Sequence, residues 1–160
     1  DSETEARNML RARAKATIGK VLDLSIAGRL GMVVDGTGRD YGKISSQVRM
    51  LKELGYDCYM VFVNTSLNVA LERNKQRERT VPAYATTKSW EQVQSNMGKF
   101  QNLFGLSNFI VVDNNANERE LATITINKMN KVIRGLLSRS ISSYTAKRWM
   151  ATERKIRRRT

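Results

Sequence analysis

The residues best suited to phosphate chemistry follow a short apolar run, in the stretch DGTGRD. Asp35 closes the run Leu30–Val34, and behind it come Gly36, Thr37, Gly38 and Arg39. An acidic residue in this position can hold Mg²⁺ through a water molecule, and glycines let a backbone approach a phosphate closely. The alternative is that Asp35 starts a turn or caps the next helix.

A second group of candidates is basic and lies in the stretch LERNKQRERTVP, which contains Arg73, Arg77 and Arg79. A helix is predicted through this stretch, so Arg73 and Arg77 would share one helix face and Arg79 would lie where the helix ends. Like charges at this spacing are mildly destabilising. A triphosphate undergoing transfer would offset them, because arginines stabilise the charge of a moving phosphoryl group. The alternative is a solvated basic face balanced by Glu72 and Glu78.

The stretch TGRDYGKI, residues 37–44, approaches the phosphate-binding pattern G-x-x-x-x-G-K-[ST] without matching it. Thr37 replaces the first glycine. Ile44 replaces the hydroxyl residue, and an isoleucine cannot ligate Mg²⁺. Nowhere else do the 160 residues contain the pattern, so we expect no such phosphate cradle within them.

Apolar runs that alternate with amphipathic stretches predict an α/β fold that positions these residues. Strands are predicted at 30–35, 57–63 and 108–113. Helices are predicted at 2–28 with a break near Ile18, and at 40–54, 64–79, 87–104, 117–137 and 141–158, with a loop around Pro82 at 80–87. Strands that are apolar throughout are typical of a mostly parallel sheet covered on both faces, which is a three-layer sandwich.

The ends of the predicted strands are polar. In open sheets of this type, ligands bind at the carboxyl ends of the strands. We therefore expect one site lined by the three strand ends, namely Asp35 to Gly38, Asn64 with Thr65, and Asp113 with Asn114 and Asn115.

Composition restricts the chemistry. The chain has no histidine and one cysteine, Cys58, which excludes a Ser-His-Asp triad, a Cys-His pair and any histidine-containing zinc site. Cys58 lies in the apolar run CYMVFV, where we expect a buried thiol and a cytoplasmic setting. No apolar run approaches the roughly 20 residues that span a bilayer, so no membrane partner is expected.

The formal net charge of +13 favours polyanionic partners. We interpret residues 1–140 as the α/β domain and 141–160 as a basic C-terminal helix or tail. There, cations would contact phosphates of a nucleic acid and a tryptophan would stack on its bases. The candidate contacts are Lys147, Arg148, Trp149, Arg154, Lys155, Arg157, Arg158 and Arg159. The alternative is a solvated basic tail.

Three stretches, MVVDGTGRD, YMVFVNTSLNVALERNKQRERTVP and SWEQVQSNMGKFQNLFG, resemble P-loop kinases of the zeta-toxin and phage polynucleotide-kinase type. The resemblance spans residues 28–115 and implies ATP and Mg²⁺ as cofactors, in a phage or bacterial context. It implies that Asp35 is the acid beside Mg²⁺ and that Arg73 and Arg77 match the R-x-x-x-R of a lid on the ATP phosphates. Arg79 and the Pro82 loop would complete the lid, and the loop at 113–115 would lie near the adenine.

The same resemblance implies about 50 to 60 residues ahead of Asp1, with a strand, the Walker A loop, a helix and a second strand. In the family's sheet, the P-loop strand lies between the strands that match 30–35 and 58–63. We therefore expect either part of a longer kinase or a degenerate domain in which 30–35 and 58–63 pair directly.

These cases imply different functions. Part of a kinase would serve to transfer the γ-phosphate of ATP to a hydroxyl of a small molecule or a polynucleotide, and the isolated chain would bind nucleotide weakly and transfer nothing. A degenerate domain would be a non-catalytic nucleic-acid-binding or virion-associated protein. A third interpretation is a homo-oligomer that pairs through the sheet edge or the helix at 117–137.

Overall fold

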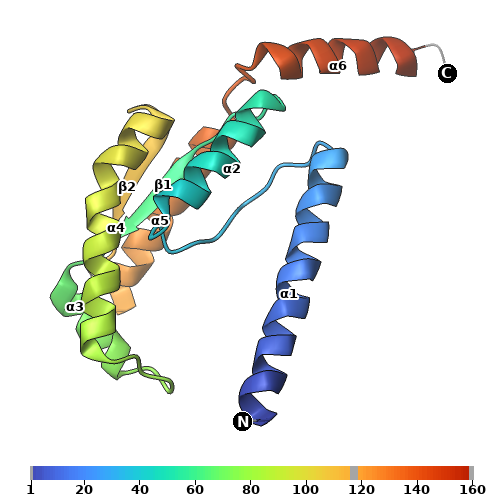
Figure 1. Cartoon of the computed structure of the whole chain (residues 1–160). Helices are drawn as coiled ribbons and strands as arrows, with labels where there is room; N and C mark the ends of the chain where they lie inside the picture. The colour runs from blue at the N-terminus through green and yellow to red at the C-terminus, as the bar shows by residue number, and fades with distance from the viewer. Residues whose placement is uncertain (1, 116–118, 159–160) are drawn as a thin grey trace. The chain divides into compact units, whose positions relative to one another are not determined.

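In the computed structural model of the chain, residues 2–115 and 119–158 are described, and the chain divides into two units, residues 1–36 and 37–160. The first unit contains α1 (Ser2–Ala27) and an irregular segment after it (Figure 1). The second unit contains α2 (Tyr41–Glu53), β1 (Met60–Asn64), α3 (Leu67–Lys75), α4 (Ala83–Phe104), β2 (Phe109–Asp113), α5 (Arg119–Leu137) and α6 (Tyr144–Arg157).

Helix α1 is continuous, so the predicted break near Ile18 is wrong. Its alanines and long charged side chains favour a helix by intrinsic propensity. Its apolar residues form no single stripe, and large ones such as Val21 and Leu24 are exposed. Within the described parts of the chain, no helix combines the length and hydrophobicity needed to cross a membrane.

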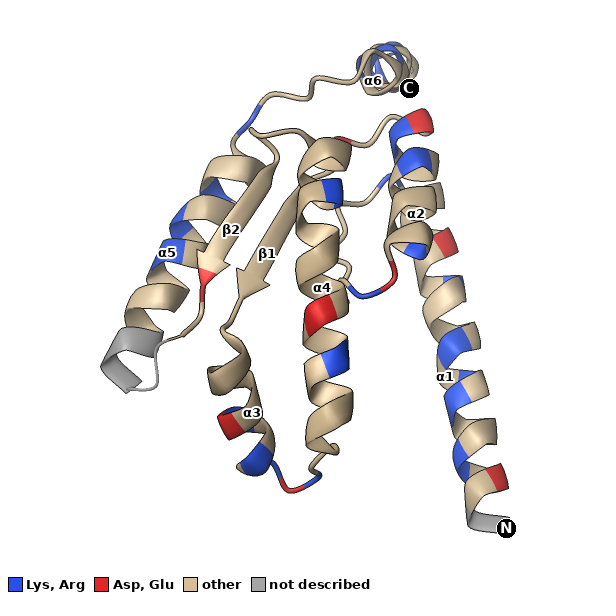
Figure 2. Ribbon diagram, turned by 60° about the vertical axis from the view of Figure 1, so that its left-hand side comes forward, with Lys and Arg blue, Asp and Glu red and all other residues tan. Residues whose placement is uncertain are grey.

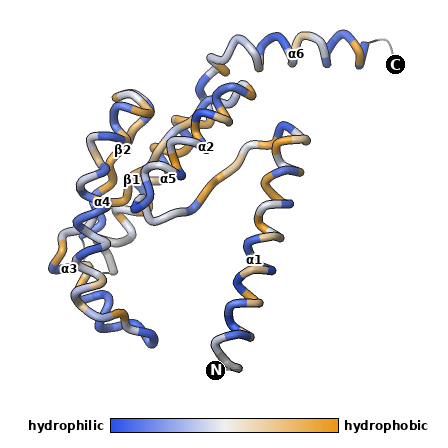
Figure 3. Tube along the Cα trace, viewed as in Figure 1, coloured by the Kyte–Doolittle hydropathy of each residue, from blue (hydrophilic) through white to orange (hydrophobic). Residues whose placement is uncertain are grey.

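The segment after α1 corrects the prediction of a strand at 30–35. This segment is hydrophobic (Figure 3), but it has no regular structure and Val33 is 100% exposed. A buried parallel strand needs a neighbouring strand to satisfy its backbone N–H and C=O groups. The described sheet consists of β1 and β2 alone. Of the two alternatives that the sequence left open, direct pairing of 30–35 with 58–63 is therefore not found among the described residues.

Strands β1 and β2 pair in parallel, with Met60 opposite Phe109 and Asn64 opposite Asp113. The predicted strands at 57–63 and 108–113 are thereby confirmed, apart from small shifts at their ends. The α/β class is confirmed too. The full three-layer sandwich stays a prediction, because the sheet within the described residues has two strands.

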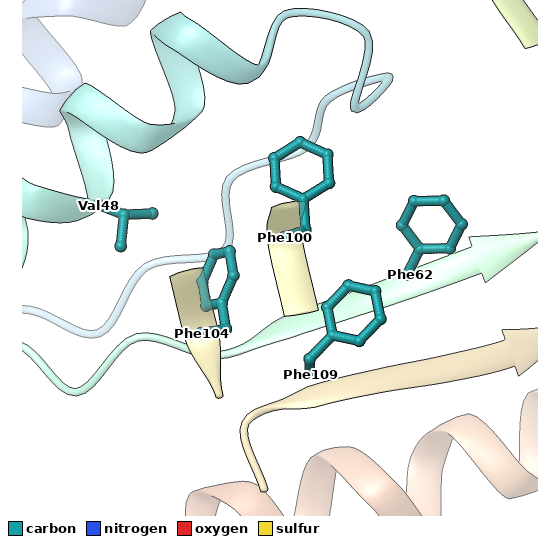
Figure 4. Close-up of a cluster of buried hydrophobic side chains, with 5 residues drawn as sticks. All are labelled: Val48, Phe62, Phe100, Phe104 and Phe109. Carbon is teal, nitrogen blue, oxygen red and sulfur yellow. The ribbon is translucent and has the colours of Figure 1, made fainter. Parts of the chain in front are cut away.

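A phenylalanine cluster holds α4 against one face of the sheet (Figure 4). Phe100 of α4 is 0% exposed, and Phe104 follows one turn later. Phe62 of β1 and Phe109 of β2 pack in the same cluster, and the centroids of the Phe62 and Phe109 rings are 5.7 Å apart. Val48 of α2 completes the cluster. Burial of these large side chains is the main source of cohesion in the second unit.

The helix predicted at 87–104 is confirmed in α4, which begins four residues earlier and buries an apolar stripe in this cluster. Val93 and Met97 pack against its edge, while Trp90 is half-buried. Helix α5 contacts β2 on the face opposite α4 (Figures 1 and 2). Val112 is buried there, since alternate residues of a strand point to opposite faces. Residues 117 and 118 of the helix predicted at 117–137 lie outside the described residues.

The start of α6 is anchored to the loop between α2 and β1. Asp57 accepts hydrogen bonds from the backbone N–H and the hydroxyl of Ser142. Gly55 has φ +101, and a Cβ at this position would lie 3.0 Å from the backbone N of Ala146. The close approach therefore requires glycine. Ser143 caps the helix by accepting from Ala146 N at 3.3 Å.

We predict that Phe100→Ala lowers the free energy of unfolding of the second unit by about 3–5 kcal/mol, because it leaves a cavity beside three other rings. Urea denaturation followed by circular dichroism measures this change. Leu106→Ala is the control, because Leu106 is 78% exposed and its truncation should change stability by less than about 0.5 kcal/mol. Equal effects of the two substitutions would show that the cluster is not the core.

Candidate functional site

The carboxyl ends of β1 and β2 lie side by side, and hydrogen bonds join the loops that follow them. The backbone N–H of Asn114 donates to the carbonyl of Asn64 at 2.8 Å. The backbone N–H of Ser66 donates to Asn115 Oδ1 at 2.7 Å. Asp113 Oδ1 accepts from both the backbone and the side chain of Asn115. The structure thus brings together two of the three predicted strand ends.

Helix α4 supports this polar network from the side. Trp90 Nε1 donates to the carbonyl of Thr65 at 2.7 Å, and Gln94 Nε2 donates to Asn64 Oδ1 at 2.8 Å. The spacing of four places both donors on one helix face. Neither Trp90 nor Gln94 was among the predicted site residues. The available signal was a polar residue one turn after a tryptophan, whose ring N–H needs an acceptor when buried.

The second unit begins with a loop at residues 37–40, hereafter the TGRD loop, which a buried side chain of α4 holds in place. Asn96 is 6% exposed, and its Nδ2 donates to the carbonyls of Gly38 at 3.1 Å and Arg39 at 2.8 Å. Gly38 is buried and has φ +72, a conformation that favours glycine. Thr37 and Arg39 are exposed beside it. No pattern in the sequence indicated that Asn96 holds this loop.

Asp35 and Gly36 end the first unit, and both are exposed. Asp35 does not cap the next helix. That role belongs to Asp40, whose Oδ1 accepts from Lys43 N at 2.9 Å. Because Asp35 belongs to the first unit and the strand ends to the second, their predicted meeting stays a prediction. Among the described residues, no three acidic or cysteine side chains gather as a metal site, and the magnesium role of Asp35 also stays a prediction.

The arginine-rich stretch differs from its prediction, because α3 ends at Lys75 rather than near Arg79. Arg73 is half-buried in the last turn of α3, whereas Arg77 and Arg79 are exposed on the loop that follows (Figure 2). The predicted helix face shared by Arg73 and Arg77 is therefore wrong. All three arginines still belong to one short segment. We call residues 76–80 the arginine loop.

A buried amide explains why the helix stops. Asn74 is 8% exposed; its Nδ2 donates to the carbonyl of Val81 at 2.6 Å, and its Oδ1 accepts from Val81 N at 3.1 Å. These bonds fold the chain back on itself and compete with further helix. Pro82 then precedes the first residue of α4, a position that suits proline because it lacks an N–H. Because α4 begins at Ala83, the loop is shorter than the one predicted at 80–87.

The strand ends and the arginine loop lie at opposite ends of α3. The nine residues of α3 span about 14 Å at the usual rise of an α-helix. The TGRD loop and the strand-end network are both held by the middle of α4. The second unit therefore presents polar strand ends and a loop on which Thr37 and Arg39 are exposed, with basic side chains one short helix away from the strand ends.

Cys58 lies outside this arrangement, because it precedes β1 at the amino end of the sheet. Burial raises the pKa of its thiol; Lys52 opposes the rise and Asp57 adds to it. The thiol is half-buried rather than fully buried as predicted. A raised pKa keeps it neutral near pH 7, which is unsuited to a nucleophile.

Comparison with known proteins identifies the family. A family model described as an AAA domain (AAA_33) matches residues 1–100, which include the TGRD loop and the arginine loop. No curated protein and no solved structure gives a significant match. The zeta-toxin or polynucleotide-kinase type therefore stays a prediction. Because the match covers more than half of the chain, the chain belongs to this AAA domain family, which is of the P-loop NTPase and kinase-like kind.

Proposed function

We propose that the chain is part of an ATP-dependent phosphotransferase that transfers the γ-phosphate of ATP to a hydroxyl of a small molecule or a polynucleotide. The observation that carries the proposal is the arginine loop. It exposes Arg77 and Arg79 together, next to Arg73, within the residues that the family match covers. Arg77 and Arg79 flank Glu78 on this short loop, and two exposed guanidinium groups so close in sequence can both donate to one polyanion.

The loops would have separate roles toward the nucleotide. Arg77 and Arg79 would donate to the oxygens of the β- and γ-phosphates and stabilise the charge that develops during transfer. The backbone of the TGRD loop, with Gly36 before it, would lie along the phosphates. The strand-end loop, with Asp113, Asn114 and Asn115, would lie near the adenine.

The oxygen ligands that the chain offers fit a nucleotide bound with Mg²⁺. Asp35 offers an exposed carboxylate, the kind of oxygen ligand that Mg²⁺ prefers. Mg²⁺ commonly takes one or two carboxylates and completes its shell with waters and substrate phosphates. When bound, the ion would neutralise phosphate charge and orient the triphosphate.

We predict that the chain binds Mg·ATP weakly but more tightly than AMP, because the arginines contact the β- and γ-phosphates. Arg77→Ala/Arg79→Ala should weaken ATP binding by about tenfold, or about threefold for each exposed contact, and leave AMP binding unchanged. Isothermal titration calorimetry measures both affinities. Lys128→Ala/Lys131→Ala removes the same charge from exposed sites on α5 and should change neither. An ATP affinity equal in all variants would contradict the proposed function.

A second function, nucleic-acid binding, is favoured by α6. Lys147, Arg154 and Arg158 follow one another at spacings of seven and four, which places them on one side of the helix. Arg148 and Lys155 lie beside them. A shallow concave surface next to Trp149 is lined by Tyr144, Thr145, Arg148 and Thr152. Arg159, another predicted contact, lies outside the described residues.

If α6 binds DNA through phosphates, Lys147→Ala/Arg154→Ala/Arg158→Ala should reduce the slope of log K against log salt concentration by about 2.7, since each phosphate contact contributes about 0.9. Fluorescence anisotropy of a labelled duplex at several salt concentrations gives the slope. The matched control is Lys128→Ala/Lys131→Ala/Arg134→Ala on α5, which should reduce it little. Similar slopes for the two triple variants would mean that only net charge matters.

A further inference from the structure

Two buried amides in the second unit are used to hold loops. Asn74 and Asn96 are among the few polar side chains buried in the described parts of the chain. Each directs its side-chain amide to the backbone of a loop rather than to another side chain. A buried amide left without partners is unfavourable. Each asparagine therefore fixes the loop whose backbone it contacts.

Asn74 ties the arginine loop at both ends. Its side chain donates to and accepts from the same residue, Val81, just after the loop. Its backbone carbonyl accepts from Arg77 N at 3.4 Å, at the start of the loop. Between these attachments, Glu78, Arg79 and Thr80 are exposed. The loop is therefore closed at its base and open to solvent at its tip.

We propose that Asn74 is a positioning residue that holds Arg77 and Arg79 in the arrangement in which both can contact one triphosphate. This inference rests on the proposed function. Its physical basis is preorganisation: a loop whose ends are already fixed loses less conformational freedom when its side chains bind an anion. Without the two hydrogen bonds to Val81, the loop would lose conformational entropy when the anion binds, and the affinity for the anion would be lower.

Limited digestion with trypsin tests the clamp directly, because trypsin cleaves after Arg77 and Arg79. In Asn74→Ala we expect initial cleavage at these bonds to be about tenfold faster than in the unmodified chain, since local opening becomes easier. Asn96→Ala is the matched control. It also removes a buried amide with two backbone hydrogen bonds, but it should leave these cleavage rates unchanged. Cleavage in Asn74→Ala at the unmodified rate would overturn the clamp.

Binding of inorganic tripolyphosphate tests the positioning role. Asn74→Ala should weaken it about as much as Arg77→Ala/Arg79→Ala does, although both arginines are still present, whereas Lys128→Ala/Lys131→Ala on α5 should not. If the arginine variant binds weakly and Asn74→Ala binds normally despite faster cleavage, the positioning role fails and the proposed function stands. If the arginine variant also binds normally, the proposed function fails and the positioning role fails with it.

Asn74→Asp keeps the test decisive if Asn74→Ala does not fold. An aspartate retains the acceptor for the Val81 N–H, but its second oxygen replaces the donor and repels the Val81 carbonyl when the carboxyl group is ionised. We expect faster cleavage at Arg77 and Arg79 in this variant too, because the hydrogen bond to the Val81 carbonyl is replaced by repulsion. Cleavage at the unmodified rate would count against the clamp in the same way.

Discussion

The packing of Phe100 and Phe104 against the paired strands is the constraint on which the second unit depends. A two-stranded sheet is marginal by itself and needs a helix on its face to be stable. Helix α4 supplies that cover through the phenylalanine cluster. Once these rings fix the rotation of α4, its polar positions are fixed as well. Gln94 then faces the end of β1, and Asn96 faces the TGRD loop.

Much of this packing could be predicted from the sequence, because it follows from local periodicity. The stripe from Val93 to Phe104 repeats at three and four residues, which indicates a buried helix face. The runs that became β1 and β2 are apolar and bounded by polar residues, which indicates buried strands. The run at 30–35 carries the same signal but forms no strand. Hydrophobicity is a property of the segment, whereas pairing depends on a neighbour elsewhere in the chain.

The site was less predictable, because its geometry depends on single side chains that reach across several residues. Helical propensity continues smoothly past Lys75, whereas the contact between Asn74 and Val81 folds the chain back after α3. Asn96 lies next to an apolar stripe and gave no sign of a partner 58 residues away. A polar residue within or beside a buried face must find hydrogen-bond partners. The two asparagines therefore indicate that such partners exist, but not which residues they are. Candidate charged residues are visible in a sequence, while the residues that position them are seen only in the fold.

Helix α4 also links the parts of the candidate site mechanically. The arginine loop leads into its first turn through Pro82, while Trp90 and Gln94 hold the strand end and Asn96 holds the TGRD loop. A helix is rigid over this length compared with loops. A displacement of α4 would therefore move all three attachments together. Because the phenylalanine cluster resists such a displacement, the core fixes the distances between loops that would have to contact one nucleotide at the same time.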